Sequence, residues 1–118
     1  MKSMDHLDMQ VRLTIFSDNQ EEDGTFGKGV ATLLEGIRDY GSLNASAKQI
    51  HMAYSKAWRI IKEAESCLGF ALLERQGALG STLTNEGLRL LDIYLQLESE
   101  STRQLYKRFH ELLQASEQ

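Results

Sequence analysis

The fold is decided by the stretch Gly41-Ser-Leu-Asn-Ala-Ser-Ala-Lys-Gln-Ile-His-Met-Ala-Tyr-Ser-Lys-Ala-Trp-Arg-Ile-Ile61. Its first part predicts a short helix that Ser42 caps, with the small residue Ala47 where a second helix would touch it. A break at 51–53 follows, and His51 stands where the turn of such a pair needs a positive φ, which histidine tolerates better than most residues. The pattern predicts a helix-turn-helix. The apolar residues expected to lock the two helices together are Ile50, Met52, Ala57 and Ile60.

The second helix of this pair, expected over 54–66, has two chemically different faces at about 100° per residue. The face expected to join the core carries Tyr54, Ala57, Trp58, Ile60, Ile61 and Ala64. The opposite face carries Ser55, Lys56, Arg59, Lys62, Glu63 and Ser66. Three basic side chains on one face suit either an ordinary solvated surface or contact with a polyanion.

The flanking segments extend the fold in both directions. Apolar residues at helical spacing predict a further helix before Gly41, and alternation in 10–16 with a polar turn after it predicts an N-terminal β-hairpin over 10–26. Beyond Gly69, short extended segments at 71–75 and 82–84 predict a small hairpin, the wing. Thr84 is placed to cap a long helix over 85–115.

We therefore expect one domain spanning 1–118, mainly α with a small β wing (α+β). Its parts are an N-terminal hairpin (10–26), a winged helix-turn-helix (27–84) and a C-terminal helix (85–115).

The charge is distributed unevenly along the 118 residues, whose formal net charge is −4. Residues 1–41 and 81–118 are acidic, whereas residues 42–80 carry a balance of +2. A negative net charge argues against indiscriminate binding of polyanions, but it permits a local basic patch. That patch falls on the helix-turn-helix.

The sequence gives little support for an enzymatic or metal-binding function. His6, His51 and His110 lie far apart and have no ligand spacing with Cys67, so no metal and no cofactor is expected. The glycines of 24–29 lack the spacing of a phosphate-binding loop, and no nucleophile elbow is present. No run of apolar residues is long enough for a membrane span, and the N-terminus has no signal-peptide pattern. With a single cysteine, the sequence predicts a cytoplasmic protein that is not an enzyme.

A set of short matches resembles one family. In order they are Phe26-Gly-Lys-Gly29, Leu33-Leu34-Glu35, Gly41-Ser-Leu43, Ala47-Lys48, Met52-x-Tyr54, Ala57-Trp58, Leu68-Gly69, Leu73-Glu-Arg75, Leu83-Thr84, Gly87 and Tyr94. Together they resemble the N-terminal DNA-binding domain of ModE-type molybdate-responsive regulators, a relative of the LysR-type domain. The resemblance covers roughly 26–97 and implies a dimeric winged helix whose third helix enters the major groove of DNA.

The chain departs from that family in three ways. Ala53 replaces the usual serine before the tyrosine of the third helix, which removes a helix cap. The wing at 76–81 is short and has no lysine, so Arg75, Ser81 and Thr82 are its candidates for contact with DNA. The separate oxyanion-binding domain of full-length relatives has no counterpart here, and we expect no oxyanion ligand.

The last helix predicts a homodimer, because an apolar stripe at spacings of three and four runs along about 45 Å. The residues expected at the dimer interface are Leu88, Leu91, Leu95, Leu105, Phe109 and Leu112. Alternatively, 99–102 ends one helix and caps a second, which folds back on the same subunit through Leu105, Phe109, Leu112 and Leu113.

The sequence as a whole predicts a dimeric transcriptional regulator that binds duplex DNA sequence-specifically. Ser55, Lys56 and Arg59 are expected to reach base edges, and Lys48, Lys62 and Arg75 to contact phosphates. The alternative is a winged-helix protein-interaction module that no longer binds DNA.

Overall fold

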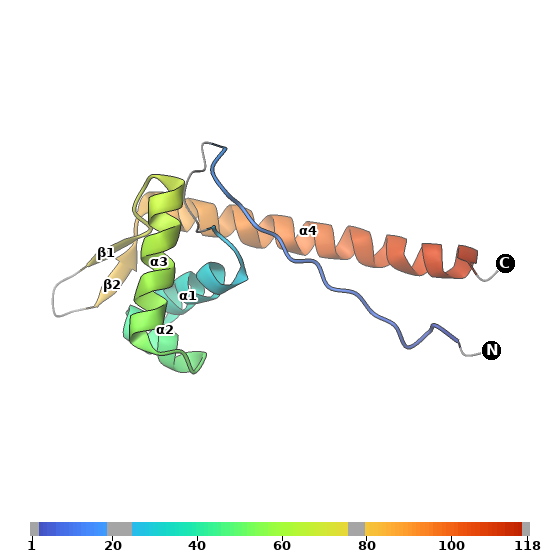
Figure 1. Ribbon diagram of the computed structural model, residues 1–118, viewed down its shortest axis with the longest axis horizontal. Helices are drawn as coiled ribbons and strands as arrows, with labels where there is room; N and C mark the ends of the chain where they lie inside the picture. Colours follow the sequence, from blue (N-terminus) through green and yellow to red (C-terminus); the bar gives the residue numbers. More distant parts are fainter. Residues whose placement is uncertain (1–2, 19–24, 76–79, 117–118) are drawn as a thin grey trace.

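The computed structural model describes residues 3–18, 25–75 and 80–116. In this part of the chain the elements follow in the order α1, α2, α3, β1, β2 and α4, and the two strands form one small sheet. Figure 1 shows α1, α2, α3 and the sheet gathered at one end of α4, which projects well beyond them. The predicted mainly helical fold with a small wing is confirmed.

The first two helices end and begin where the sequence predicts. Helix α1 (Lys28–Tyr40) stops at Gly41, whose backbone is left-handed with φ 86° and whose N–H donates to the carbonyl of Ile37. Glycine adopts this conformation without steric cost. Helix α2 (Leu43–Gln49) begins after Ser42, whose Oγ accepts the N–H of Ala45 at 3.0 Å.

The turn between α2 and α3 (Tyr54–Leu68) confirms the predicted role of His51. Its φ is 56°, and it is the one non-glycine residue with positive φ in the described part of the chain. The carbonyl of Ala47 accepts the N–H of Met52 at 2.9 Å, which closes the turn. Helix α3 then ends at Gly69, which has the left-handed φ of 86° expected of a helix C-cap.

Helices α1 and α2 cross in close contact at Gly36. The side chain of Ser46 lies where a Cβ at Gly36 would stand, so no larger residue fits there without displacing α2. The Ser46 hydroxyl is buried and donates to the carbonyl of Leu33 at 2.7 Å. A buried hydroxyl needs such a partner, since an unpaired one is costly.

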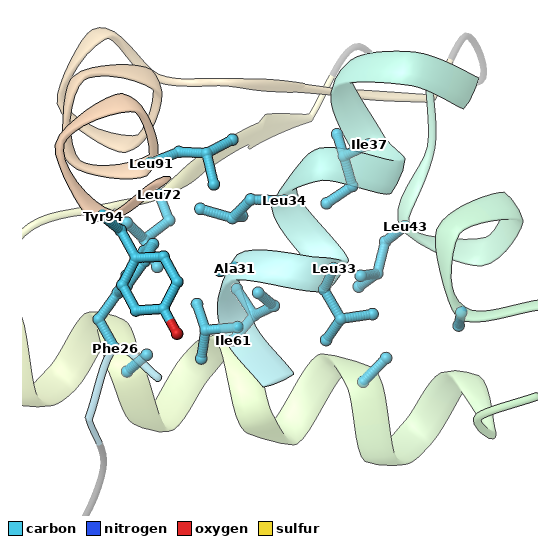
Figure 2. Close-up of a cluster of buried hydrophobic side chains, with 14 residues drawn as sticks. Phe26, Ala31, Leu33, Leu34, Ile37, Leu43, Ile61, Leu72, Leu91 and Tyr94 are labelled. Carbon is cyan, nitrogen blue, oxygen red and sulfur yellow. The ribbon is translucent and has the colours of Figure 1, made fainter. Parts of the chain in front are cut away.

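The core lies between α1, α3 and the first turns of α4. Figure 2 shows Leu91 of α4 pointing toward Leu34 of α1, and the ring of Tyr94 pointing toward α3 with Phe26 beside it. The Phe26 and Tyr94 rings are 5.4 Å apart between centroids. The buried apolar cluster comprises Phe26, Val30, Ala31, Leu33, Leu34, Ile37, Leu43, Ala47, Ala57, Ile61, Ala64, Leu72, Leu91 and Tyr94.

The wing forms as the sequence predicts, with strand β1 (Leu73–Arg75) antiparallel to β2 (Ser81–Leu83). The turn that joins them, 76–79, lies outside the described residues. One anchor of the wing was not anticipated: the carboxylate of Glu65 on α3 accepts the N–H groups of Leu72 and Leu73 at 2.7 and 3.3 Å. This carboxylate fixes the wing to α3.

The predicted N-terminal hairpin over 10–26 is wrong. Ile15 and Phe26 exchange two backbone hydrogen bonds of 2.9 and 2.8 Å, but among the described residues this is an isolated bridge and no strand extends from it. Side chains in 11–16 do alternate between half-buried and exposed. The alternation arises because Leu13 and Ile15 pack against the core, and because Val11 lines a groove with Leu95 of α4.

Helix α4 (Asn85–Ser116) is continuous, so the alternative in which it breaks at 99–102 is also wrong. Thr84 caps its start, since Oγ accepts the N–H of Gly87 at 2.9 Å, as predicted. Ser101 does not cap a second helix, because its hydroxyl donates back to the carbonyl of Leu97 at 2.7 Å within α4. The apolar residues beyond this point therefore project away from the core.

Candidate nucleic-acid interface

The polar face of α3 is exposed along its length. Ala57, Ile61 and Ala64 are buried on the inner side of the helix. The four α3 residues expected to contact DNA, Ser55, Lys56, Arg59 and Lys62, all lie on the outer side and are exposed. The structure thus brings these four candidates together on one convex surface, which is the shape that fits a DNA groove.

Two of the basic side chains on this face have acidic partners. Arg59 Nη1 lies 3.2 Å from Glu63 Oε1, and both side chains are about half exposed. Lys62 Nζ lies 3.1 Å from Glu65 Oε1, the carboxylate that also holds the wing. Exposed pairs of this kind contribute about 0–1 kcal/mol, so a phosphate or a base edge can replace the Glu63 contact at small cost.

The remaining candidates flank this face. Lys48 is exposed in the last turn of α2. Arg75 is exposed at the end of β1, and Ser81 and Thr82 are respectively half-buried and exposed at the start of β2. The backbone N–H of Ser81 donates to the carbonyl of Gly41 at 3.1 Å, which ties the wing to the C-terminus of α1.

The expectation that Tyr54 belongs to the core is wrong, and that for Trp58 holds in part. Tyr54 is 44% exposed at the first position of α3. Its hydroxyl accepts a hydrogen bond of 3.4 Å from Arg75 Nη2. Trp58 packs its inner edge against the core, while Lys62 and Arg75 lie over its ring at 4.4 and 4.7 Å from the centroid. Sequence spacing within α3 gave no sign of this link to the wing.

A polar hollow of about 210 Å³ lies beside this cluster, between the start of α2, the start of α3 and the wing. Arg75 and Tyr54, which are joined by the hydrogen bond described above, are two of the residues that line it. Gly80 also lines it with φ 108°, a conformation that favours glycine. The residues that line the hollow are Ser42, Leu43, Asn44, Tyr54, Arg75, Gly80 and Ser81.

The start of α3 carries the consequence of Ala53. This residue is the N-cap, with extended backbone, and it makes no side-chain capping hydrogen bond. The first backbone N–H groups of α3 are therefore not satisfied by a cap, and the positive end of the helix dipole is accessible to an anion.

The predicted dimer residues do not share one environment. Leu91 is fully buried in the core of its own chain, so its assignment to a dimer interface is wrong. Leu95 packs half-buried against the same core. Leu88, Leu105 and Leu112 are 41%, 46% and 51% exposed. The last of the set, Phe109, is half-buried.

Neither a metal site nor a membrane helix is found in the part of the chain that the structure describes. No three histidine, cysteine, aspartate or glutamate side chains come close enough to hold a metal ion. None of the described helices is both long enough and apolar enough to cross a membrane.

Comparison with known proteins agrees with this geometry. Residues 31–88, just under half of the chain, match the family model of the bacterial regulatory helix-turn-helix proteins of the lysR family. The chain is also similar to a solved structure described as "Crystal structure of CbnR_DBD-DNA complex", with a TM-score of 0.53 and 24% sequence identity, covering 75% of this chain and 94% of that one. A search of curated proteins found no significant match. Residues 31–88 are therefore similar in sequence to a lysR-type helix-turn-helix, and the likeness to the solved structure supports the winged-helix fold.

Proposed function

Starting from the match of residues 31–88 to the lysR-type helix-turn-helix, we propose that the chain binds duplex DNA sequence-specifically as a homodimer and uses α3 as its recognition helix. The observation that carries the proposal is the outer face of α3. It gathers Ser55, Lys56 and Arg59 on an exposed surface of the one positively charged third of the sequence.

Each side chain on this face suits a particular part of DNA. The guanidinium of Arg59 can donate two parallel hydrogen bonds to the O6 and N7 acceptors of guanine in the major groove. Ser55 and Lys56 reach base edges from the preceding turn. Lys48 and Lys62 lie farther out and supply charge to backbone phosphates, which fix the register of the protein without reading sequence.

The wing contributes a second set of contacts. Arg75 is the charged residue of this set, and Ser81 and Thr82 add hydroxyl groups on β2. Because few phosphates are contacted by one copy, a single winged helix binds weakly at physiological salt. Two copies on two half-sites offset this weakness and the net charge of −4 that each carries.

The distal half of α4 is the surface proposed to join the two copies. Leu105, Phe109 and Leu112, called here the distal stripe, lie at a spacing of four and three on one side of the helix. Leu105 and Leu112 are about half exposed, and apolar residues that gather in a patch on one surface can mark an interaction site. A second copy of the stripe would bury both.

We also propose that the chain is related more specifically to the DNA-binding domain of ModE-type regulators. The pattern Met52-x-Tyr54 followed by Ala57-Trp58 supports it, whereas the short wing without lysine is a difference. Molybdate sensing is not carried over. A DNA-binding regulator of bacterial type works where the chromosome is, so we place the chain in the cytoplasm.

The test is a titration of the full chain against a DNA duplex recovered by selection from a randomised library, repeated at several salt concentrations. We expect Arg59→Ala to weaken binding to this duplex by about 1–3 kcal/mol and to relax base preference at one position. The thermal melting of the variant should match that of the wild type, because Arg59 is exposed.

The control is Arg108→Ala. Arg108 and Glu111 form an exposed ion pair of 3.3 Å on α4, closely similar to that of Arg59 and Glu63 in exposure and length. This variant should bind DNA as the wild type does. Equal affinity of the Arg59 variant and the wild type would reject the α3 face as the recognition surface. Salt-independent behaviour, or no binding to any duplex, would favour the protein-interaction module instead.

A further inference from the structure

We propose that Tyr54 and Trp58 are positioning residues: they hold the side chain of Arg75 at the polar hollow so that it is ready to bind one phosphate of the DNA backbone. This inference rests on the proposed function, in which α3 and the wing face DNA. It adds that two aromatic residues of α3 prepare a contact that belongs to the wing.

The contacts that support the inference involve a row of side chains on one side of α3. Tyr54, Trp58 and Lys62 are spaced by four residues, so they stand one above the other on the same side of the helix. Arg75 extends from β1 and contacts the first two of them, Tyr54 and Trp58. Its Nη2 donates to Tyr54 Oη at 3.4 Å, and its guanidinium carbon lies 4.7 Å from the centre of the Trp58 ring.

Both groups that hold Arg75 are electrically neutral. In the described part of the chain Arg75 makes no ion pair, whereas Arg59 pairs with Glu63 and Lys62 pairs with Glu65. Binding of a phosphate by Arg75 therefore breaks no ion pair. Stacking on an aromatic face leaves the N–H donors at the edge of the guanidinium free to point at an anion.

Holding the side chain in advance also lowers the entropic cost of binding. An exposed arginine populates many rotamers, and it loses this freedom when it binds a phosphate. A guanidinium that is already stacked and hydrogen-bonded has lost part of the freedom before DNA arrives, and such preorganisation raises affinity.

The hollow beside Arg75 has the donors that a phosphate diester needs. Besides the positively charged Arg75, the residues that line it include Tyr54, Asn44, Ser42 and Ser81, whose side chains all carry hydrogen-bond donors. Charge-assisted bonds from arginine to phosphate are among the stronger hydrogen bonds in proteins. A phosphate of the DNA backbone is therefore the ligand that this arrangement fits.

The experiment is a double-mutant cycle on DNA affinity, measured with the selected duplex and with an unrelated duplex. Tyr54→Phe removes one oxygen atom and keeps the ring. We expect it to weaken binding to both duplexes by the same factor, about threefold, since a phosphate contact carries no sequence information. Arg75→Gln should weaken both by a larger factor and reduce the salt slope by about one.

The decisive arm combines the two changes. In the Arg75→Gln background, Tyr54→Phe should cause no further loss of affinity, because the hydroxyl acts through Arg75. Trp58→Phe, which keeps a smaller ring, should give a partial loss that is likewise reduced in that background. Tyr106→Phe is the matched control, because it removes a hydroxyl from a tyrosine of similar exposure on the distal half of α4. It should leave affinity unchanged.

The outcomes separate this inference from the function on which it rests. A Tyr54→Phe variant that binds as the wild type does, or whose loss persists unchanged without Arg75, would overturn the positioning role while Arg59→Ala still weakens binding. If neither the wild type nor any variant shows salt-dependent binding to duplex DNA, the proposed function fails and the positioning role fails with it.

Discussion

The two halves of α4 carry the same kind of apolar pattern and use it differently. In the proximal half, up to Glu98, Leu91 and Tyr94 are fully buried against α1 and the chain around Phe26. In the distal half, Leu105 and Leu112 continue the same side of the helix, yet about half of each side chain is exposed. The proximal half completes the core of its own chain, whereas Leu105 and Leu112 of the distal half lie outside the core that the described residues form.

This difference shows what a periodic pattern does and does not specify. A stripe at spacings of three and four indicates that one side of a helix is buried, but it does not name the surface that buries it. Helix α4 has 32 residues and is therefore about 48 Å long, which exceeds what the small core can cover. The proposal of a homodimer therefore rests more on the length of the helix than on its pattern.

The largest effect is expected from Leu91→Ala in the proximal half. The substitution leaves a cavity between α1 and α4 and should lower the free energy of unfolding by about 2–5 kcal/mol. Leu105→Ala in the distal half is the matched control and should change the free energy of unfolding of the monomer by less than about 0.5 kcal/mol. Urea denaturation at low protein concentration measures both. Equal losses at the two positions would abolish the distinction between the halves.

A different effect is expected from charge in the distal stripe. The double variant Leu105→Glu with Phe109→Glu should fold normally but sediment as a 13.4 kDa monomer. Its affinity for a two-half-site duplex should fall by roughly 100-fold, because simultaneous binding of two linked copies is lost.

The matched control adds the same two charges away from the stripe, at Gln104 and Gln114. It should sediment and bind DNA as the wild type does. If the wild type itself sediments as a monomer at micromolar concentration, the distal stripe is not a dimer surface.

Local signals allowed most of the helix-turn-helix to be predicted from the sequence. Gly41, Ser42, His51 and Thr84 each act through their own backbone conformation or through a hydrogen bond to a near neighbour. Such effects depend on few residues, so the sequence shows them directly. The outward face of α3 followed from helical periodicity for the same reason.

The features that were missed depend on contacts between distant segments. The exposure of Tyr54 and its bond to Arg75 require knowledge of where the wing lies. The anchoring of Leu72 by Glu65 is of the same kind. In the N-terminal segment, alternation was correct but its partner was not, since a side of α4 produces the same period-two burial as a second strand. Pattern alone does not distinguish these neighbours.

The smallest effect in the comparison is expected at the junction between the two halves, where Tyr94 Oη donates to Glu98 Oε2 at 3.3 Å. Tyr94→Phe keeps the ring against Phe26 and removes this bond, so the free energy of unfolding should fall by about 0.5–1.5 kcal/mol near neutral pH.

The pH dependence of this variant tests the burial of Tyr94 itself. Burial raises the pKa of Tyr94 above its ordinary 10.0, and the neighbouring carboxylate of Glu98 raises it further. Below this ordinary pKa the phenol is neutral in both states and contributes no pH dependence. As the pH rises through about 10, the unfolded chain loses the phenol proton before the native chain does, so this group lowers the stability of the wild type until the native pKa is passed.

The phenylalanine variant lacks this contribution. Its deficit in free energy of unfolding relative to the wild type should therefore shrink or reverse at about pH 11 compared with about pH 8. Urea denaturation at the two pH values measures the change. A deficit that stays constant across this range would mean that Tyr94 titrates alike in the native and unfolded states. The proximal half of α4 would then exclude water from Tyr94 less well than the core contacts indicate.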